Sequence, residues 1–306
     1  MVYLIVITNT MKNLFLITFL LVTSLCFGQL KSVIVNSETK ETIPCVNIWI
    51  EDENIGTTSN ENGVFELEVS GSKTIIFSAI GFATKEILSD IVKDVLELKP
   101  QITLLDEVVV RSKRQSKKVV IGKFNKSKIK HYFSSGSKPW IIAKYFKFNE
   151  DYNETPFLNK IKLLTNSEVE NSKFNVRLYS IGGDGKPESY IYDENIIGTA
   201  LKGKKITEID ISDLNIEFPT DGFFIAIEWL IIENNKHKYS YKIKSSKKKI
   251  NAISYEPSIG TIPSESEHNS WGFVRGKWER VWKNVGSSKR YQNKYNVLAI
   301  ELTLTD

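Results

Sequence analysis

The segment from Leu30 to Val110 constrains the fold most strongly, because apolar and polar residues alternate there over short runs. Every second side chain is apolar in VNIWI (46–50) and in FELEV (65–69). This period of two is typical of half-buried antiparallel strands. Between the runs, GTTSNENG concentrates glycine and asparagine, which tolerate positive φ angles, so we expect a chain reversal and a hairpin of the two runs. The segment is predicted to be a small β-sandwich.

Four phrases of this segment also resemble a known family. They are LKSVIVNSETKETIPCVNIWI, GTTSNENGVFELEV, TIIFSAIGF and ITLLDEVVV. Residues 30–110 resemble the carboxypeptidase-regulatory-like domain, which implies a seven-stranded transthyretin-like sandwich. That domain precedes the plug of many TonB-dependent outer-membrane receptors and also occurs in barrel-free envelope proteins. The resemblance implies a structural or adhesive role rather than catalysis.

Residues 1–28 are predicted to be a signal peptide. Met11 and Lys12 begin a short basic segment, residues 14–25 are apolar, and small residues precede Gln29. We expect translation to start at Met11 and the mature protein to begin at Gln29. An uncleaved anchor is the alternative, but the apolar run is shorter than the roughly 20 residues that a membrane-spanning helix needs. The expected location is the periplasm, the outer-membrane surface or the outside of the cell.

The net charge changes sign along the mature chain. Residues 29–110 carry six lysines against fourteen acidic residues, a net charge of −8, whereas residues 111–306 carry 34 basic against 22 acidic residues, a net charge of +12. Such a break indicates a domain boundary. The runs RSKRQSKK and KSKIK predict a basic linker at residues 111–130, followed by a second domain at 131–306. Without residues 1–28, Cys45 is the single cysteine, so no internal disulfide is expected.

The second domain is predicted to be a larger, jelly-roll-like β-sandwich, so the whole chain is expected to be all-β. About nine of its segments are rich in β-branched and aromatic residues and are separated by turn-forming residues. The apolar run from Phe223 to Ile232 is predicted to be a central strand that is covered on both faces. In the first domain, residues 89–98 are expected to form a short helix or an edge strand.

Sequence motifs for catalysis are absent. The three histidines, His131, His237 and His268, show no spacing of a zinc site, and there is no GxSxG or P-loop motif. We therefore predict that the chain is not an enzyme and that it has no catalytic residues, no metal site and no cofactor.

Five of the six tryptophans lie in the second domain, and three of them fall within twelve residues of one another. On a strand, alternate residues of this cluster would share one face, where rings can stack on sugars. The candidate ligand-binding residues are therefore Trp271, Trp278, Arg280 and Trp282. The alternative is that these rings fill the core of the sandwich.

These features together predict a non-catalytic cell-envelope protein that is a binding or structural module. Its expected partner is a glycan or an envelope protein, with peripheral contact to the outer membrane, whereas nucleic acid is not expected. Two alternatives remain: a hydrolase of envelope polysaccharide, which would need two carboxylates in one cleft, and a periplasmic accessory of a TonB-dependent receptor.

Overall fold

The computed structural model describes residues 28–101, 116–136, 139–243, 248–284 and 289–306. Within these ranges the chain is built from strands, and its helical segments are 3-10 turns of at most five residues. The predicted all-β fold is confirmed. No helix within the same ranges is long and apolar enough to cross a membrane. The predicted signal peptide, except Gly28, and the ITLLDEVVV segment lie outside the described residues.

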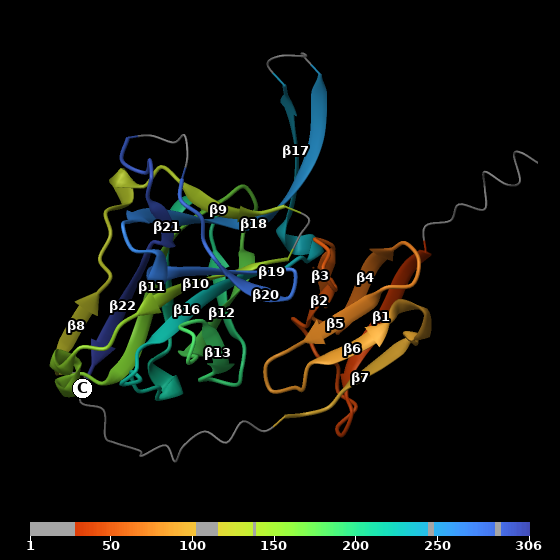
Figure 1. Cartoon of the computed structure of the whole chain (residues 1–306), viewed down its shortest axis with the longest axis horizontal. Coiled ribbons are helices and arrows are strands. Elements are labelled where there is room, and N and C mark those ends of the chain that lie inside the picture. The colour runs from red at the N-terminus through yellow and green to blue at the C-terminus, as the bar shows by residue number, and fades with distance from the viewer. Residues whose placement is uncertain (1–27, 102–115, 137–138, 244–247, 285–288) are drawn as a thin grey trace, which may run out of the picture.

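Residues 28–101 form two facing sheets, which we call the N-terminal sandwich (Figure 1). The strand order is β4-β1-β7 in one sheet and β3-β2-β5-β6 in the other. The elements are β1 (Gly28–Asn36), β2 (Asn47–Ile50), β3 (Gly56–Thr58), β4 (Val64–Val69), β5 (Thr74–Ser78), β6 (Lys85–Leu88), η1 (Ser89–Ile91) and β7 (Val95–Leu98). The apolar residues of FELEV are buried between the sheets, whereas its two glutamates are exposed. Residues 89–98 form both a helical turn, η1, and an edge strand, β7.

The predicted hairpin between VNIWI and FELEV is wrong. Strand β2 pairs with β3 and β5, whereas β4 pairs with β1 in the opposite sheet. The chain does reverse before β4, where Gly63 has a φ of 71°, but the reversal carries it from one sheet to the other. A Cβ on Gly63 would lie 2.7 Å from the backbone oxygen of Ile34, so a side chain does not fit there. The three-residue strand β3, too short to show an alternation, takes the place beside β2.

Residues 116–306 form a larger pair of facing sheets, the C-terminal sandwich. One sheet has the order β13-β12-β16-β10-β19-β20, with β14 also paired to β12. The other has the order β17-β18-β11-β22-β8, with β15 paired to β11, and β9 and β21 paired to β18. The strands are β8 (Lys118–Ile121), β9 (Tyr132–Ser135), β10 (Ile141–Phe146), β11 (Phe157–Ser167), β12 (Ser172–Ile181), β13 (Pro187–Tyr190), β14 (Ile196–Ala200), β15 (Gly203–Asp210), β16 (Phe223–Trp229), β17 (Lys236–Lys242), β18 (Lys249–Ser264), β19 (Ser270–Val274), β20 (Lys277–Arg280), β21 (Tyr295–Leu298) and β22 (Ile300–Thr305). The 3-10 turns are η2 (Lys126–Lys128), η3 (Glu150–Glu154), η4 (Ser212–Leu214), η5 (Glu233–Asn235) and η6 (Glu267–Asn269).

Strand β16 is the central strand that the apolar run predicted. It pairs with β12 on one side and β10 on the other, and all of its side chains are buried. One face of β16 faces the main core, which holds Phe223, Ile225 and Ile227. The other face carries Phe224 and Ala226 into a second apolar cluster on the outer side of the sheet. The N-terminal sandwich packs against this outer cluster, since Trp49 meets Phe273 there.

Part of the predicted basic linker is a strand. Residues 118–121 form β8, which pairs with β22 at the edge of the eight-stranded sheet. Ser116 and the backbone N–H of Lys117 also hydrogen-bond to the side chain of Asp306. The C-terminal sandwich therefore begins before residue 131. Lysines flank the short apolar run 119–121, so a domain boundary predicted from charge alone assigns this strand to the linker.

Candidate functional site

The hairpin of β19 and β20 positions the aromatic residues that the sequence singled out. Its two turn residues, Arg275 and Gly276, have φ angles of 55° and 78°, which are typical of a tight two-residue turn. In the resulting register Trp271 lies opposite Arg280, and Phe273 lies opposite Trp278. Directly opposite residues project from the same side of a sheet, so these four side chains share one face.

The four predicted ligand residues have three different environments. Trp271 is only 4% exposed and belongs to the outer apolar cluster, and the Arg280 guanidinium lies 4.7 Å from the centroid of its ring. Trp282 is 81% exposed and lies beyond the end of β20, so the alternation that would place it beside Trp278 does not continue. Trp278 is half-buried and packs against Phe273, with ring centroids 5.2 Å apart.

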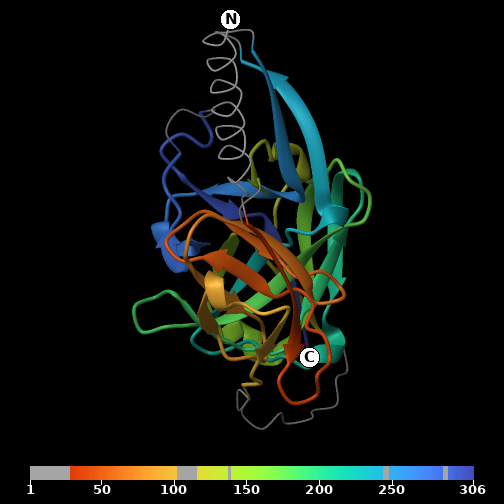
Figure 2. The ribbon, with the colours of Figure 1, turned by 90° about the vertical axis from the view of Figure 1, so that its right-hand side faces the viewer.

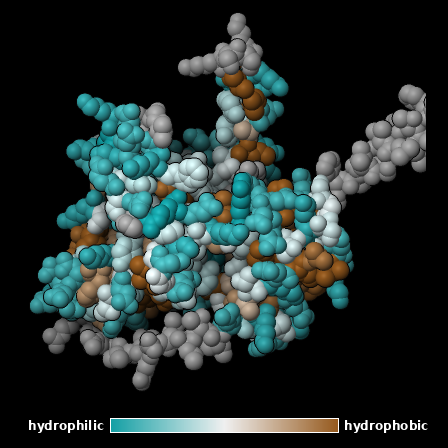
Figure 3. All heavy atoms as spheres, viewed as in Figure 1, coloured by the Kyte–Doolittle hydropathy of each residue, from teal (hydrophilic) through white to brown (hydrophobic). Residues whose placement is uncertain are grey.

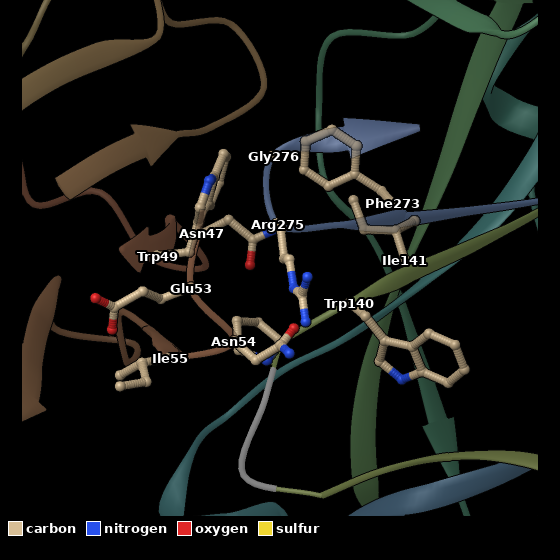
Figure 4. A pocket seen from close by; sticks show the side chains of 11 residues that line it. Asn47, Trp49, Glu53, Asn54, Ile55, Trp140, Ile141, Phe273, Arg275 and Gly276 are labelled. Carbon is tan, nitrogen blue, oxygen red and sulfur yellow. The ribbon is translucent and has the colours of Figure 1, made fainter. Parts of the chain in front are cut away.

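The N-terminal sandwich packs against this face of the sheet (Figures 1 and 2). Trp49 of β2 meets Phe273 edge to face, with ring centroids 5.6 Å apart and an interplanar angle of 85°. Figure 4 shows both side chains at this junction, beside the turn that carries Arg275 and Gly276. The hydroxyl of Thr58 accepts a hydrogen bond of 3.1 Å from the backbone N–H of Ile231. The contact between the sandwiches is therefore both apolar and hydrogen-bonded.

A buried ion pair lies at the same junction. The side chains of Arg177 on β12 and Glu228 on β16 are 1% and 2% exposed, and Nε and Nη2 of Arg177 lie 2.7 and 2.6 Å from Oε2 of Glu228. Nδ2 of Asn47, from the N-terminal sandwich, donates to Oε1 of the same carboxylate. Burial raises the pKa of the Glu228 carboxyl above its ordinary value, while the charge of Arg177 opposes that rise. Asn47 thus connects one sandwich to the buried charges of the other.

Cys45 lies next to this network, in the turn before β2. Its φ is 58°. Burial, followed by the charge of Glu228, raises the pKa of the Cys45 thiol to about 11. The thiol is therefore protonated at neutral pH, which disfavours it as a nucleophile.

A cavity of about 200 Å³ lies between the two sandwiches, beside the ion pair. Its aromatic wall contains Tyr179, Tyr190 and Trp278, and the ring centroid of Tyr179 lies 4.8 Å from that of Tyr190 and 5.4 Å from that of Trp278. The opposite wall comes from the N-terminal sandwich. The polar side chains that line the cavity are Asn47, Ser78, Thr84 and Glu188. Flat rings that face hydroxyl, amide and carboxylate groups are suited to an uncharged, hydroxyl-rich ligand.

Among the buried polar atoms of the junction that have no hydrogen-bond partner, two belong to residues that line the cavity. They are Oδ1 of Asn47 and Nε1 of Trp49. Buried polar groups are normally hydrogen-bonded, but neither atom is exposed to the cavity, so a ligand bound there would not reach them. A smaller space of about 20 Å³ adjoins them, lined by Trp140, Arg275 and Gly276 (Figure 4). That volume is sufficient for about one water molecule.

Several residues of this site were missed by the sequence analysis. Asn47 and Glu228 each interrupt an apolar run, in VNIWI and GFFIAIEWLII, and Arg177 lies between Val176 and Leu178 in KFNVRLYSI. A charged residue in such a run needs a buried partner, and this signal could have been used. The partners themselves come from separate strands. Only the tertiary structure pairs them.

No group of three or more histidine, cysteine, aspartate or glutamate side chains could hold a metal ion in the part of the chain that the structure describes. His131 stacks on Tyr291, with ring centroids 4.1 Å apart, and His237 stacks on Tyr239 at 5.6 Å.

Comparison with known proteins identifies the N-terminal segment. Residues 30–110 match the family model of the CarboxypepD_reg-like domain, so the resemblance inferred from the sequence is confirmed for this segment. No curated protein matches the chain.

Two similar solved structures belong to one clostridial protein. The cysteine protease and lectin-like domains of Cwp84, a surface layer associated protein of Clostridium difficile, share 13% identity over 55% of this chain and 32% of that chain, with a TM-score of 0.34. The clostridial cysteine protease Cwp84 after propeptide cleavage shares 15% identity over 64% of this chain and 42% of that chain, with a TM-score of 0.36. The chain spans less than half of either protein. Similarity at this level carries no argument about function.

Proposed function

We propose, from the premise that residues 30–110 are a CarboxypepD_reg-like domain, that this chain is an exported, non-catalytic envelope protein that binds a glycan between its two sandwiches. The cavity at the junction carries this proposal, because it combines three clustered aromatic rings with hydroxyl, amide and carboxylate side chains. Its volume of about 200 Å³ is below the range of roughly 300–1,000 Å³ that is typical for drug-sized ligands. The expected ligand is therefore one sugar unit, at the end or on a branch of a glycan.

The lining of the cavity favours binding over hydrolysis. A glycosidase needs two carboxyl groups that flank the scissile bond. Glu188 is the carboxylate among the described lining residues, and Glu228 nearby is held by Arg177 and Asn47. A carboxylate in that network is not free to transfer a proton or to attack a sugar. This arrangement supports the binding hypothesis over the polysaccharide hydrolase.

Replacing Trp278 by alanine is expected to weaken glycan binding by at least ~1 kcal/mol, about fivefold in Kd, because a stacking ring is lost. A glycan array with the full mature chain would identify the sugar, and calorimetry would measure its affinity. Trp282→Ala is the matched control, since this ring is 81% exposed and does not line the cavity. Thr84→Val removes one lining hydroxyl at nearly constant volume and should also weaken binding.

Three results would contradict the glycan proposal. The first is a wild-type protein that retains no sugar on the array. The second is equal loss of affinity in Trp278→Ala and Trp282→Ala. The third is a Trp278→Ala protein whose melting temperature falls while sugar affinity is unchanged, which would assign the ring to packing alone.

Export predicts that the protein isolated from the cell envelope begins at or near Gln29. Intact-mass measurement of the exported chain tests this expectation. A mass that includes residues 11–28 would contradict cleavage and favour the membrane-anchored alternative. The strand β1 starts at Gly28 and pairs residue by residue with β4, so cleavage at this point would leave the ladder almost complete.

A further inference from the structure

Strand β17 and the first half of β18 form a hairpin that extends away from the body of the C-terminal sandwich (Figures 1 and 2). We call residues 236–243 and 248–255 of this hairpin the arm. Lys236 to Lys242 pair in antiparallel register with Tyr255 to Lys249, whereas the β9, β11 and β21 neighbours of β18 pair with it from Tyr255 onward. Seven residues of extended chain span about 20 Å. Among the described residues no third strand pairs with residues 236–242 or 249–254, so the arm is a two-stranded ribbon beyond its base.

Aromatic rings follow one face of the arm. His237, Tyr239 and Tyr241 occupy alternate positions of β17, and their ring centroids are 5.6 and 6.2 Å apart with interplanar angles of 16° and 28°. Tyr239 is 43% and Tyr241 is 49% exposed. Ile253 of the opposite strand is 39% exposed and lies opposite Lys238, so it projects from the other face. Isolated two-stranded hairpins are marginally stable in water, so these exposed apolar groups need a function to account for them.

The arm is also strongly basic. Among residues 236–243 and 248–255 there are five lysines and no acidic residue. Lys236 forms an ion pair with Glu233 at its base, at 2.8 Å. Lys238, Lys242 and Lys249 are exposed further out. In Figure 3 the arm shows both hydrophilic and hydrophobic atoms along its length.

We infer that the arm docks on an anionic lipid surface. Lysine side chains gain electrostatic free energy near anionic headgroups, and tyrosine rings favour the boundary between headgroups and acyl chains. Long lysine stems can extend along the ribbon to reach phosphates from either face. Exposed isoleucine favours a lipid over an acidic polysaccharide, because a sugar chain offers no apolar phase for an aliphatic side chain. The lysines lie on one face of the ribbon and the tyrosine row on the other, and a narrow ribbon that enters the headgroup layer exposes both faces to lipid.

Sedimentation with vesicles tests this inference on the full mature chain. Vesicles of equal parts phosphatidylglycerol and phosphatidylethanolamine should retain the protein at low salt, whereas phosphatidylcholine vesicles should not. The variant Lys238→Gln/Lys242→Gln/Lys249→Gln should bind the anionic vesicles at least ~10-fold more weakly, because each lysine near the surface contributes to binding. Tyr239→Ser/Tyr241→Ser should remove the part of the binding that survives high salt.

The matched control is Lys126→Gln/Lys128→Gln/Lys130→Gln, which removes the same charge from exposed positions in and next to η2. It should keep most of the affinity. Equal weakening by both triple variants would overturn the inference, since net charge alone would then explain the binding. Three other results would also overturn it: no retention of the wild type, retention by acidic polysaccharide but not by vesicles, or an arm variant that changes self-association alone. The last result would instead assign the arm to the acidic N-terminal sandwich of a second copy.

Discussion

Replacing Arg177 by methionine is expected to lower the free energy of unfolding by about 3–5 kcal/mol, because it leaves Glu228 charged or newly protonated in a buried site. Both side chains of this pair are at most 2% exposed. The carboxylate would keep hydrogen bonds from Asn47 and Asn175 but no opposite charge. Urea unfolding monitored by tryptophan fluorescence would measure the loss, and Trp229 beside Glu228 is a buried reporter.

The double variant Arg177→Met/Glu228→Leu should recover most of that stability, since it removes both charges and refills the space with apolar atoms. Lys117→Gln is the control for an exposed ion pair, because Lys117 and Glu154 are 58% and 72% exposed and such pairs contribute little. If Arg177→Met were no more destabilising than Lys117→Gln, the buried pair would not stabilise the junction. A double variant as unstable as the single variant would show that the site tolerates no apolar replacement.

Replacing Lys144 by methionine is expected to increase the free energy of unfolding at neutral and acidic pH by about 2–4 kcal/mol. Lys144 is buried on the inner face of β10, where its Nζ donates to the carbonyl of Ile300 at 2.8 Å and lies 4.8 Å from the centroid of the Phe146 ring. No described carboxylate forms an ion pair with it. Burial therefore lowers the pKa of Lys144 to about 7.

The stability gained by Lys144→Met is expected to depend on pH, because the pKa of Lys144 is lower in the folded state than in the unfolded chain. Below the folded pKa of about 7, lysine is charged in both states, so the folded state carries the full cost of burying the charge. Between that pH and the ordinary lysine pKa of about 10.4, the unfolded chain binds one more proton, so wild-type stability rises with pH. The advantage of Lys144→Met should therefore disappear as the pH approaches 10. Lys147→Met, at an exposed position just after β10, should show no such pH-dependent difference. A gain for Lys144→Met that is the same at pH 6 and pH 10 would contradict the assignment.

The local sequence predicted a strand and its buried side chains where apolar and polar residues alternate, and also where an apolar run is unbroken. The alternation of FELEV identified β4 and its buried face, and the unbroken apolar run from Phe223 identified the central strand β16. It was insufficient where pairing is long-range. The strands of VNIWI and FELEV lie in different sheets, and KVVI joins β22 almost two hundred residues away in the sequence. The residues of such a short strand do not indicate which distant strand it pairs with.

The site shows the same division. Residue type and spacing identified the aromatic cluster at 271–282, because tryptophan is rare and its rings are large. Residue type and spacing do not predict that Arg280 covers Trp271, that Trp282 is exposed, or that Trp278 faces a cavity. These environments depend on where β20 ends and on how the N-terminal sandwich packs against the hairpin.

The sequence by itself determined the all-β class, the N-terminal family and the charge contrast between the two parts, because each follows from composition or from short-range periodicity. The tertiary structure alone decided that Arg177, Glu228 and Asn47 form one buried network and that a cavity lies above it. These residues come from three strands in two sandwiches. A buried charge is stable only beside its partner, and that partner is chosen by the packing of the sheets rather than by neighbours along the chain.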